Sequence, residues 1–573
     1  MKNLLQRQWA MSGLLALAAS TALQAQTWHW ASAPTAIIDP APAGAPGGSA
    51  IVATASDGAG NTIVAGNFYG SLTLGATTLI SAGHTDVFVA RVGPNGEWLQ
   101  VAQAGGPSED LVSGLKLDAM GNAVVSGRFG NLVTGARANF GSLVLTSAGS
   151  TDAFVARLSP SGQWTQAVRA GGSGNDEANA LALDAAGNAV VAGSFQGSTS
   201  FGSTTLAADG VTTAAFVARL NLDAGTWTQA SQSTCAFSAV PFRNLVTAVA
   251  LDAADNVVLA GQFDANTRFG SLALTNTLGG TSAYLARLSA SGQWTQAVQL
   301  NNNNRNAPPP VINALAVDGA GTATVAGILV ETVAFGSSTL TSAGGYDVFV
   351  ARLDAAGQWT QAVRAGSPAN DIARALVLDA AGNATVAGLF GVYSSASATT
   401  AMFGTLPITS SGGMYDVFVA RLSAGGQWTQ AVRAGGAGND EANALSLDAE
   451  GSITVAGSCS NPATFGSTML SGTTSHAMAY MARFASTVLA TNTPASAEAF
   501  ALAPNPTAGL VQLSWPDASA ATRRVQLFDA LGREVRRQQL PAHTRATTLD
   551  VAGLTPGLYV VRCGTSTNRL QVE

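Results

Sequence analysis

The sequence predicts an all-β protein built from one repeated unit, because two short motifs recur along most of its 573 residues and no segment shows a helical period. A tryptophan that begins W-T-Q-A, or a close variant of it, recurs at spacings of 63 to 69 residues. These tryptophans are Trp98, Trp164, Trp227, Trp294, Trp359 and Trp428. The V-A-R-L motif, or a close variant of it, recurs seven times, with its arginine at Arg91, Arg157, Arg219, Arg287, Arg352, Arg421 and Arg483. Such self-similarity is typical of repeat architectures, in which each unit packs on its neighbours.

Each unit is predicted to contain four short strands. In one unit the first strand, residues 179–183, alternates leucine with alanine, as a strand buried on both faces requires. A D-A-A-G-N turn forms a hairpin to the second strand, A-V-V-A-G-S-F, because the glycine takes a positive φ and the aspartate bonds the turn backbone. A longer connection carrying F-G-S leads to the third strand, A-F-V-A-R-L, and the tryptophan begins the fourth. Four-stranded units repeated in a ring are the signature of a β-propeller.

The strand count predicts seven blades and a ring closed by the N-terminal segment. The array holds seven first, second and third strands but six fourth strands, and the last unit stops after A-Y-M-A-R-F-A. Residues 27–33 align with the missing fourth strand, so we expect them to pair with the third strand around residues 479–484. Closure would remove an exposed sheet edge. The alternative is a strand that belongs to an incomplete extra blade.

The repeated motifs resemble a known family. The combination of D-E-A-N-A-L-A-L-D-A-A-G-N-A-V-V-A-G-S-F with D-A-F-V-A-R-L is similar to the bacterial SBBP β-propeller repeat, and the resemblance covers roughly residues 27–486. The fourth and seventh copies depart from it near Ala283 and Ala477. The resemblance implies a secreted or surface β-propeller and no particular reaction.

The chain ends predict an exported protein. Residues 1–25 have a basic start at Lys2 and Arg7, an apolar stretch and small residues before the cleavage position, as a signal peptide has. No later apolar run is long enough for a membrane-spanning helix. The predicted organisation is a signal peptide (1–25), a seven-bladed propeller (26–490), a Thr/Pro/Ala-rich linker (491–500) and a small antiparallel β-sandwich (501–573).

The last segment carries three turn motifs in a fixed order: P-N-P-T with a following glycine, D-A-L-G-R-E-V, and L-T-P-G-L-Y. They are similar to those of the type IX secretion (Por) C-terminal sorting domain. The resemblance implies recognition by the type IX machinery and release or anchoring at the cell surface. The matching residues are Pro504, Asn505, Pro506, Gly509, Gly532, Gly557 and Tyr559. The alternative is a generic terminal sandwich.

Charge and cysteine content exclude several classes of function. The formal net charge of −6 becomes −8 when Lys2 and Arg7 leave with the signal peptide, and an acidic surface argues against nucleic acid as a partner. Three widely separated cysteines without a C-x-x-C pair indicate neither a disulfide framework nor a zinc site.

One face of the propeller is predicted to be the interaction surface, for a protein or a glycan. The long insertions all fall in second-to-third or blade-to-blade connections, at 34–50, 231–244, 300–311 and 391–402. Acidic residues gather at the same face before first strands: Asp110, Asp176, Glu177, Asp371, Asp440 and Glu441. Others precede third strands: Asp86, Asp152, Asp347 and Asp416. They could ligate Ca²⁺, which prefers oxygen, or act as structural caps that bond local backbone, and we expect no resident cofactor.

No catalytic constellation is predicted. G-x-S-x-G, H-E-x-x-H, phosphate-loop and EF-hand motifs are absent, and the channel-facing positions of the first strands hold Lys116 among small or apolar residues. The V-A-R-L arginines recur too regularly for one active site, so they stack on a tryptophan or pair with a blade aspartate. We therefore expect a non-enzymatic protein, and the alternatives are a purely structural, adhesin-like component or a hydrolase or lyase acting at the channel mouth.

Overall fold

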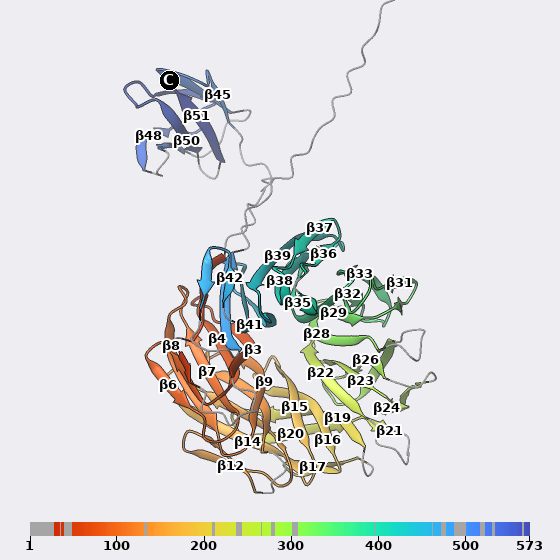
Figure 1. Ribbon diagram of the computed structural model, residues 1–573. Coiled ribbons are helices and arrows are strands. Elements are labelled where there is room, and N and C mark those ends of the chain that lie inside the picture. The colour runs from red at the N-terminus through yellow and green to blue at the C-terminus, as the bar shows by residue number, and fades with distance from the viewer. Residues whose placement is uncertain are drawn as a thin grey trace, which may run out of the picture. The chain divides into compact units, whose positions relative to one another are not determined.

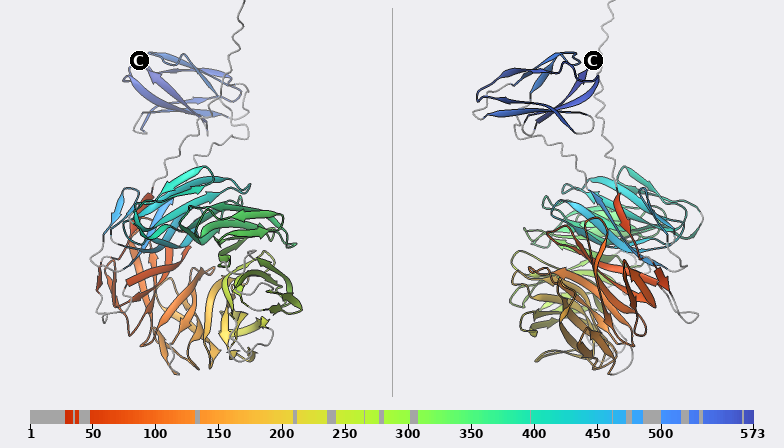
Figure 2. Two further views of the ribbon diagram at one scale, coloured as in Figure 1. Left: turned by 45° about the vertical axis from the view of Figure 1, so that its right-hand side comes forward. Right: turned by 90° about the vertical axis from the view of Figure 1, so that its left-hand side faces the viewer.

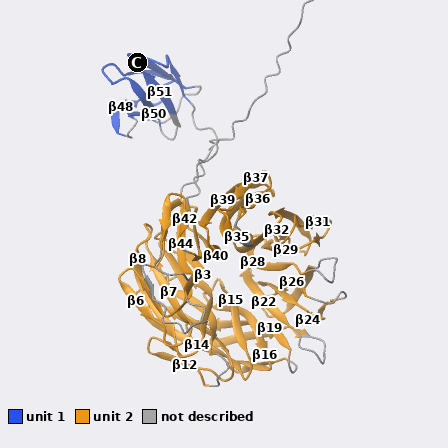
Figure 3. Cartoon of the chain, in the orientation of Figure 1, with its two compact units in different colours: residues 1–25, 487–573 blue, residues 26–486 orange. Residues whose placement is uncertain are grey.

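The computed structural model describes residues 28–34, 36–38, 48–130, 135–208, 212–235, 243–264, 266–276, 281–300, 308–395, 397–460, 462–471, 477–485, 500–515, 522–529, 533–563 and 566–573. In these ranges the chain forms antiparallel strands and no helix. The protein divides into two compact units, residues 26–486 and residues 487–573 together with 1–25 (Figure 3). The predicted signal peptide and almost all of the predicted linker lie outside the described residues.

The larger unit is a succession of four-stranded antiparallel sets. The first set is β3 (Gly48–Ser56), β4 (Thr62–Tyr69), β7 (Asp86–Val92) and β8 (Trp98–Gly105). The second and third are β9 (Asp110–Leu117), β10 (Ala123–Phe129), β13 (Asp152–Leu158), β14 (Trp164–Gly172), and β15 (Asp176–Leu183), β16 (Ala189–Gln196), β19 (Thr213–Asn221), β20 (Thr226–Gln232). The fourth and fifth are β22 (Asn244–Leu251), β23 (Val257–Phe263), β26 (Ser282–Leu288), β27 (Trp294–Leu300), and β28 (Val311–Val317), β29 (Ala323–Leu329), β32 (Asp347–Leu353), β33 (Trp359–Ala365). The sixth is β34 (Asn370–Leu378), β35 (Ala384–Ser395), β38 (Gly413–Leu422) and β39 (Trp428–Gly436).

The last set contains both ends of the repeated region. Its strands β40 (Glu441–Leu447), β41 (Ser452–Cys459) and β44 (Met478–Ala485) are followed in the sheet by β1 (Trp28–Ser32). Trp28 lies opposite Phe484 and Ala31 opposite Ala482. The N-terminal strand therefore pairs with the third strand of the last unit, as the strand count predicts.

The first strands lie innermost. Figure 1 shows the sets following one another around a common centre, and Figure 2 shows the same arrangement from two other sides. β3 lies against β9 of the next set and also against β40 of the last set. Apolar side chains from neighbouring sheets form shared cores, and Ile63 and Val89 of the first set pack with Val125 and Phe154 of the second.

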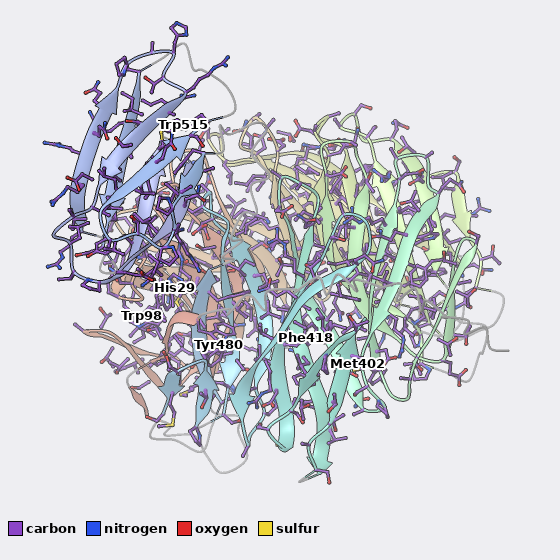
Figure 4. The ribbon with its side chains drawn as sticks, turned by 90° about the horizontal axis from the view of Figure 1, so that it is seen from above. His29, Trp98, Met402, Phe418, Tyr480 and Trp515 are labelled. Carbon is purple, nitrogen blue, oxygen red and sulfur yellow. The ribbon has the colours of Figure 1, made fainter. Side chains whose placement is uncertain are left out.

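The glycine that follows each second-strand V-V-A sequence is required by close packing. A Cβ on Gly193 would lie 1.8 Å from the carbonyl oxygen of Glu177 and 3.0 Å from the ring of Phe216. The first strand is irregular there, between Ala178 and Ala180. The ring of Phe216 thus packs directly on this backbone, and the ring of Phe418 lies equally close to Gly388 in the sixth set. Phe418 and Tyr480 of the last set are both fully buried (Figure 4).

The second-to-third connections, which the sequence predicted only as longer connections, each contain a hairpin. These hairpins are β5 (Ser71–Leu74) with β6 (Thr77–Ile80), β11 (Arg137–Phe140) with β12 (Leu143–Thr146), β17 (Ser198–Phe201) with β18 (Thr204–Ala207), β24 (Thr267–Phe269) with β25 (Leu272–Leu274), β30 (Thr332–Phe335) with β31 (Ser338–Thr341), β36 (Thr400–Phe403) with β37 (Leu406–Thr409), and β42 (Ala463–Phe465) with β43 (Thr468–Leu470). Two further short strands, β2 (Ala36–Ile38) and β21 (Thr234–Cys235), pair with β5 and β24. Strands of three or four residues give too short an alternation to be recognised in the sequence.

Tertiary packing holds each hairpin in place. β11 pairs with β8 of the preceding set, so the hairpin extends a neighbouring sheet. Phe140 of the F-G-S motif packs edge-on against Trp164, with ring centroids 5.2 Å apart. Trp28 of the N-terminal strand makes the same edge-on contact with Phe465, at 5.4 Å. Trp28 therefore takes the place of the fourth-strand tryptophan in the last set.

The V-A-R-L arginines join neighbouring sets. Arg219 Nη1 lies 2.8 Å from Asp184 Oδ2 in its own set, and the guanidinium also donates to the carbonyl of Asp255 in the next set, at 2.5 Å. Arg483 of the last set pairs with Asp448 and donates to the carbonyl of Gly60 in the first set, at 3.0 Å. Of the two predicted roles, pairing with a turn aspartate is the one that these bonds support.

The smaller unit is a two-sheet β-sandwich. One sheet has the order β45 (Ala501–Ala503), β46 (Leu510–Ser514), β49 (Ala546–Asp550), and the other has the order β48 (Glu534–Leu540), β47 (Arg523–Phe528), β50 (Gly557–Cys563), β51 (Ser566–Val572). Buried side chains of both sheets, among them Leu513, Trp515, Leu527 and Val561, form one apolar core. The predicted antiparallel sandwich is thus present.

Candidate functional site

The long insertions predicted to form the interaction surface are described only in part. Residues 35, 39–47, 236–242, 301–307 and 396 of these connections lie outside the described residues. The acidic residues at the same end of the sheets are described, and they define the geometry of the candidate site.

The aspartates before the first strands are buried caps. The side chains of Asp110, Asp176, Asp371 and Asp440 are each 2 % exposed or less. Each accepts a backbone N–H from the residue four positions earlier, at 2.7 Å from Gly106, 2.8 Å from Gly172, 2.6 Å from Ser367 and 2.7 Å from Gly436. These aspartates therefore act as caps that bond local backbone, which was one of the two roles considered from the sequence. Because they are buried, a large ligand does not reach these carboxylates directly.

The aspartates that begin or lie in the third strands are buried as completely. Asp86, Asp152, Asp347 and Asp416 each accept a backbone N–H from the preceding loop. Three of them also pair with an arginine of the adjacent fourth strand: Asp152 with Arg169 at 2.6 Å, Asp347 with Arg364 at 2.5 Å, and Asp416 with Arg433 at 3.1 Å. Asp86 instead accepts a hydrogen bond from Gln103 Nε2 at 2.8 Å.

Each third-strand aspartate meets the first-strand aspartate of the following set. A Cβ on Gly366 would lie 2.5 Å from Asp347 Oδ1 and 3.0 Å from Asp371 Oδ2, and a Cβ on Gly435 would lie 2.5 Å from Asp416 Oδ1 and 2.7 Å from Asp440 Oδ2. The two carboxylates thus converge over a glycine backbone. We call these places the carboxylate junctions: Asp86–Asp110, Asp152–Asp176, Asp347–Asp371 and Asp416–Asp440.

The carboxylate junctions have perturbed acidities. Burial, together with the charge of the partner aspartate, raises the pKa of Asp110, Asp176, Asp371 and Asp440 to about 7. Burial also raises the pKa of Asp86 to about 6, although hydrogen bonds from Ala82 and Gln103 oppose it. The sequence indicated the individual aspartates, but their pairing across sets depends on the register of separate strands and was not predicted.

The two candidate glutamates form ion pairs between sets. Glu177 pairs with Arg128 of the preceding set, and Glu441 Oε2 lies 2.8 Å from Arg374 Nη1. Asp110, Asp176, Asp371 and Asp440 begin four different sets. The six residues are therefore not brought together into one site, and ligand binding by them stays a prediction.

The centre of the larger unit holds a cavity of about 560 Å³ lined by first strands. Its wall includes Lys116 and the apolar side chains of Leu117, Leu183, Leu251, Leu378 and Leu447. Lys116 is the one ionisable side chain of this lining in the described part of the chain, and enclosure by the wall lowers its pKa. Across the described residues, no group of three or more His, Cys, Asp or Glu side chains is placed to hold a metal ion.

The sorting-motif residues differ in burial: Tyr559 belongs to the apolar core of the smaller unit, whereas Asn505 is exposed and bonds to the last strand. Asn505 Nδ2 donates to the carbonyl of Arg569 at 2.8 Å, and Asn505 Oδ1 accepts the N–H of Gln571 at 2.8 Å. Tyr559 donates its hydroxyl hydrogen to the carbonyl of Thr555 at 2.8 Å. Pro504 and Pro506 are exposed, Gly509 and Gly557 are half-buried, and Gly532 lies outside the described residues.

Comparison with known families identifies the class of the smaller unit. Residues 501–572 match the secretion system C-terminal sorting domain. The protein is therefore secreted or attached at the outer-membrane surface, and the type IX secretion machinery handles its C-terminal domain. In the described residues no helix is both long and apolar enough to cross a membrane.

The remaining comparisons are distant. A protein of unknown function from Bacteroides caccae is 10 % identical with a TM-score of 0.32, and the match covers 68 % of this chain and 94 % of that one. A PL25 ulvan lyase is 11 % identical with a TM-score of 0.36, covering 75 % and 93 %. A GH43 protein from Bacillus licheniformis is 8 % identical with a TM-score of 0.27, covering 79 % and 98 %. A comparison with curated proteins gave no match.

Proposed function

We propose that the protein is a non-catalytic, seven-bladed β-propeller of the SBBP type that binds a protein or glycan outside the cell. Each four-stranded set is one blade, and β1 completes the last blade. The bond from Arg483 to the carbonyl of Gly60 and the contact of β3 with β40 support a closed ring. The ligand approaches the face that carries the longer connections, because loops that vary on a repeated frame commonly carry binding specificity.

One observation carries the preference for binding over catalysis. Among the described residues, the buried carboxylates of the predicted interaction face are bonded to backbone or paired with neighbouring aspartates, and Lys116 shares the central cavity with apolar side chains. General acid–base catalysis needs a titratable group within hydrogen-bond reach of the reacting atom of the substrate. The bonds of these carboxylates instead favour a rigid scaffold.

The binding proposal is tested with the mature chain on glycan arrays and in pull-downs from the cell surface. Residues 301–309 of the connection between β27 and β28 would be replaced by the short G-G-S-G-N connection of residues 171–175, which joins an equivalent pair of strands. We expect this variant to lose the ligand but keep its melting temperature. A second variant alters the D-A-A-G-N turn at residues 184–188, which lies at the opposite end of the blades. If this second variant loses the ligand and the first does not, the binding face lies at that opposite end.

Two alternative functions would give different experimental results. A purely structural, adhesin-like component would show no specific ligand, and its deletion would change cell adhesion or surface integrity. A hydrolase or lyase at the channel mouth would depolymerise a polysaccharide, and Lys116→Ala would abolish that activity. Activity that depends on Lys116 would replace the non-catalytic proposal.

The export role of the smaller unit has a direct test. Deletion of residues 494–573 should leave the protein in the periplasm, because the type IX machinery recognises the sorting domain. Fractionation and immunoblotting measure this, with Asn505→Ala as a milder variant that removes two hydrogen bonds to β51. Normal surface display of the truncated chain would overturn the sorting role.

A further inference from the structure

After removal of the predicted signal peptide, the chain carries a single lysine. The sequence contains two lysines, Lys2 and Lys116, and Lys2 belongs to the signal peptide. All other side chains with a permanent positive charge are arginines, including Arg219 and Arg483, which join neighbouring sets. An arginine stays charged in a folded protein, whereas a lysine in apolar surroundings loses its proton more easily and then acts as a nucleophile. Lys116 therefore supplies the one side-chain primary amine of the mature chain.

The fold of a set does not require a lysine at this position. Lys116 lies opposite Val124 of the second strand, just as Ala182 lies opposite Val190 in the following set. The equivalent first-strand residues of the other sets are small or apolar: Ala55, Ala182, Ala250, Ala316, Val377 and Ser446. A long charged side chain among apolar neighbours costs stability unless it is paired. Lys116 is therefore a departure from the repeat that packing alone does not explain.

The side chain of Lys116 is open to the central cavity of about 560 Å³. On the following sets the wall of this cavity consists of apolar side chains, among them Leu183, Leu251, Val317 and Leu378. These four side chains are only half-buried, because they face the cavity. A cavity of several hundred Å³ with an apolar wall and one polar group is typical of a site for a small organic molecule.

The amine of Lys116 has no counter-ion in the described part of the cavity lining, which contains no acidic side chain. Enclosure by the wall is the one cause that acts on the pKa of Lys116, and it lowers this pKa. Loss of hydration without a compensating negative charge favours the neutral form of an amine. The neutral form carries the lone pair that attacks a carbonyl carbon, so the cavity both activates the amine and surrounds it with apolar surface.

We propose that Lys116 binds an apolar aldehyde covalently in the central cavity, by reversible formation of a Schiff base. The lone pair of Nζ attacks the aldehyde carbon and a C=N bond replaces the C=O bond. The carbonyl oxygen leaves as water with the two hydrogens of the neutral amine, so no oxidant or reductant is consumed. The apolar wall holds the hydrocarbon part of the ligand and discriminates against small polar aldehydes, because burial of apolar surface supplies the affinity. This inference does not depend on the binding role proposed for the loops.

The test incubates the mature chain with decanal, reduces the imine to a stable amine with borohydride and maps the adduct by peptide mass spectrometry. Because the mature chain has one lysine, peptide mapping separates an adduct at Lys116 from one at the N-terminal amine. We expect Lys116 to carry the decyl group and to react several times less with propanal. Lys116→Arg keeps the charge and Lys116→Met matches the apolar residues of the other sets. Both variants should lose the internal adduct and keep the melting temperature of the parent protein.

The matched control is Arg137→Lys, which places a second lysine on the exposed hairpin strand β11 and leaves the cavity unchanged. The two amines then compete within one molecule. At pH 7 we expect several times more decyl adduct at Lys116 than at position 137, and a smaller ratio at pH 9, where an exposed lysine is less protonated. The proposal is overturned if Lys116 forms no adduct, if both positions react equally at pH 7, or if propanal labels Lys116 as fully as decanal. Binding of decanoate without a decanal adduct would also overturn it, and would assign the cavity to a non-covalent anion.

Discussion

The two ends of the repeated sheets use the same residue type in opposite ways. At the turn end, the D-x-x-G-N aspartates pair with the V-A-R-L arginines, as Asp184 does with Arg219. At the other end, the carboxylate junctions bring two aspartates together. Burial raises the pKa of Asp57 at the turn end, but hydrogen bonds from Asn61 and Ala59 and the charge of Arg91 outweigh it, so the pKa is lowered.

This difference shows that burial alone does not determine whether a carboxylate is protonated. Asp379 at the turn end keeps a lowered pKa because hydrogen bonds from Asn383 and the charge of Arg421 exceed the effect of burial. Asp371, only eight residues earlier in the chain, has a pKa raised to about 7, because its burial is deeper and Asp347 is its neighbour. The number of donors and the sign of the nearest charge set the result.

The largest expected effect comes from removing one partner at the turn end. Arg219→Met leaves the carboxylate of Asp184 buried without its counter-ion, and we expect the free energy of unfolding to fall by about 3 kcal/mol. Urea unfolding monitored by circular dichroism measures this. The double variant Arg219→Met/Asp184→Asn is the control and should recover part of the loss. An unchanged unfolding midpoint in the single variant would mean that the ion pair does not join the sets.

Changing an aspartate to asparagine should have a smaller effect on stability, and the sign of that effect should differ between the two ends of the sheets. At pH 8 and in EDTA, Asp176→Asn should stabilise the protein by about 1 kcal/mol, because it removes a charge that a group with pKa about 7 carries at this pH. Asp379→Asn should destabilise it by about 1 kcal/mol, because it weakens the pair with Arg421. The unfolding midpoints of both variants measure these changes in stability. A change of the same sign in both variants would contradict the difference between the two ends of the sheets.

The remaining expected effect is a pH dependence of stability with a maximum. Between about pH 4 and pH 7 the folded protein keeps protons on Asp110, Asp371 and Asp440 that the unfolded chain releases, so stability falls as the pH rises through this range. The lowered pKa values of Asp57, Asp252 and Asp379 act in the other direction, and stability is lost as the pH falls through them below about 4. Melting temperatures measured from pH 3 to pH 8 in EDTA test the loss of stability on both sides of the maximum, which we call the acid limb and the alkaline limb.

Asparagine variants assign the alkaline limb to its residues. Asp440→Asn should reduce the fall in stability between about pH 4 and pH 7 and leave the loss of stability below about pH 4 unchanged, whereas Asp57→Asn should affect only the loss below about pH 4. A profile without the alkaline limb in the parent protein would show that the junction carboxylates are charged throughout.

The sequence by itself determined the repeated four-strand unit, the pairing of residues 28–32 with the last unit and the sorting domain. Repetition makes these features visible, since the same alternation, turn and aromatic position recur in every copy. Such a repeated local pattern can be recognised without knowing which distant residues each strand contacts. The arginine of V-A-R-L could be assigned two roles from sequence, and the bonds to Asp184 and Asp448 favour one of them.

Only the tertiary structure decided the outer hairpins and the carboxylate junctions. Strands such as β11 are four residues long and depend on pairing with β8 of the preceding set, so no local pattern specifies them. The approach of Asp86 to Asp110 follows from the register of β7 and β9 in different sets. Gln103 contacts Asp86 where an arginine contacts the aspartate of each of the other three junctions, and this difference in charge becomes apparent only when neighbours in space are compared.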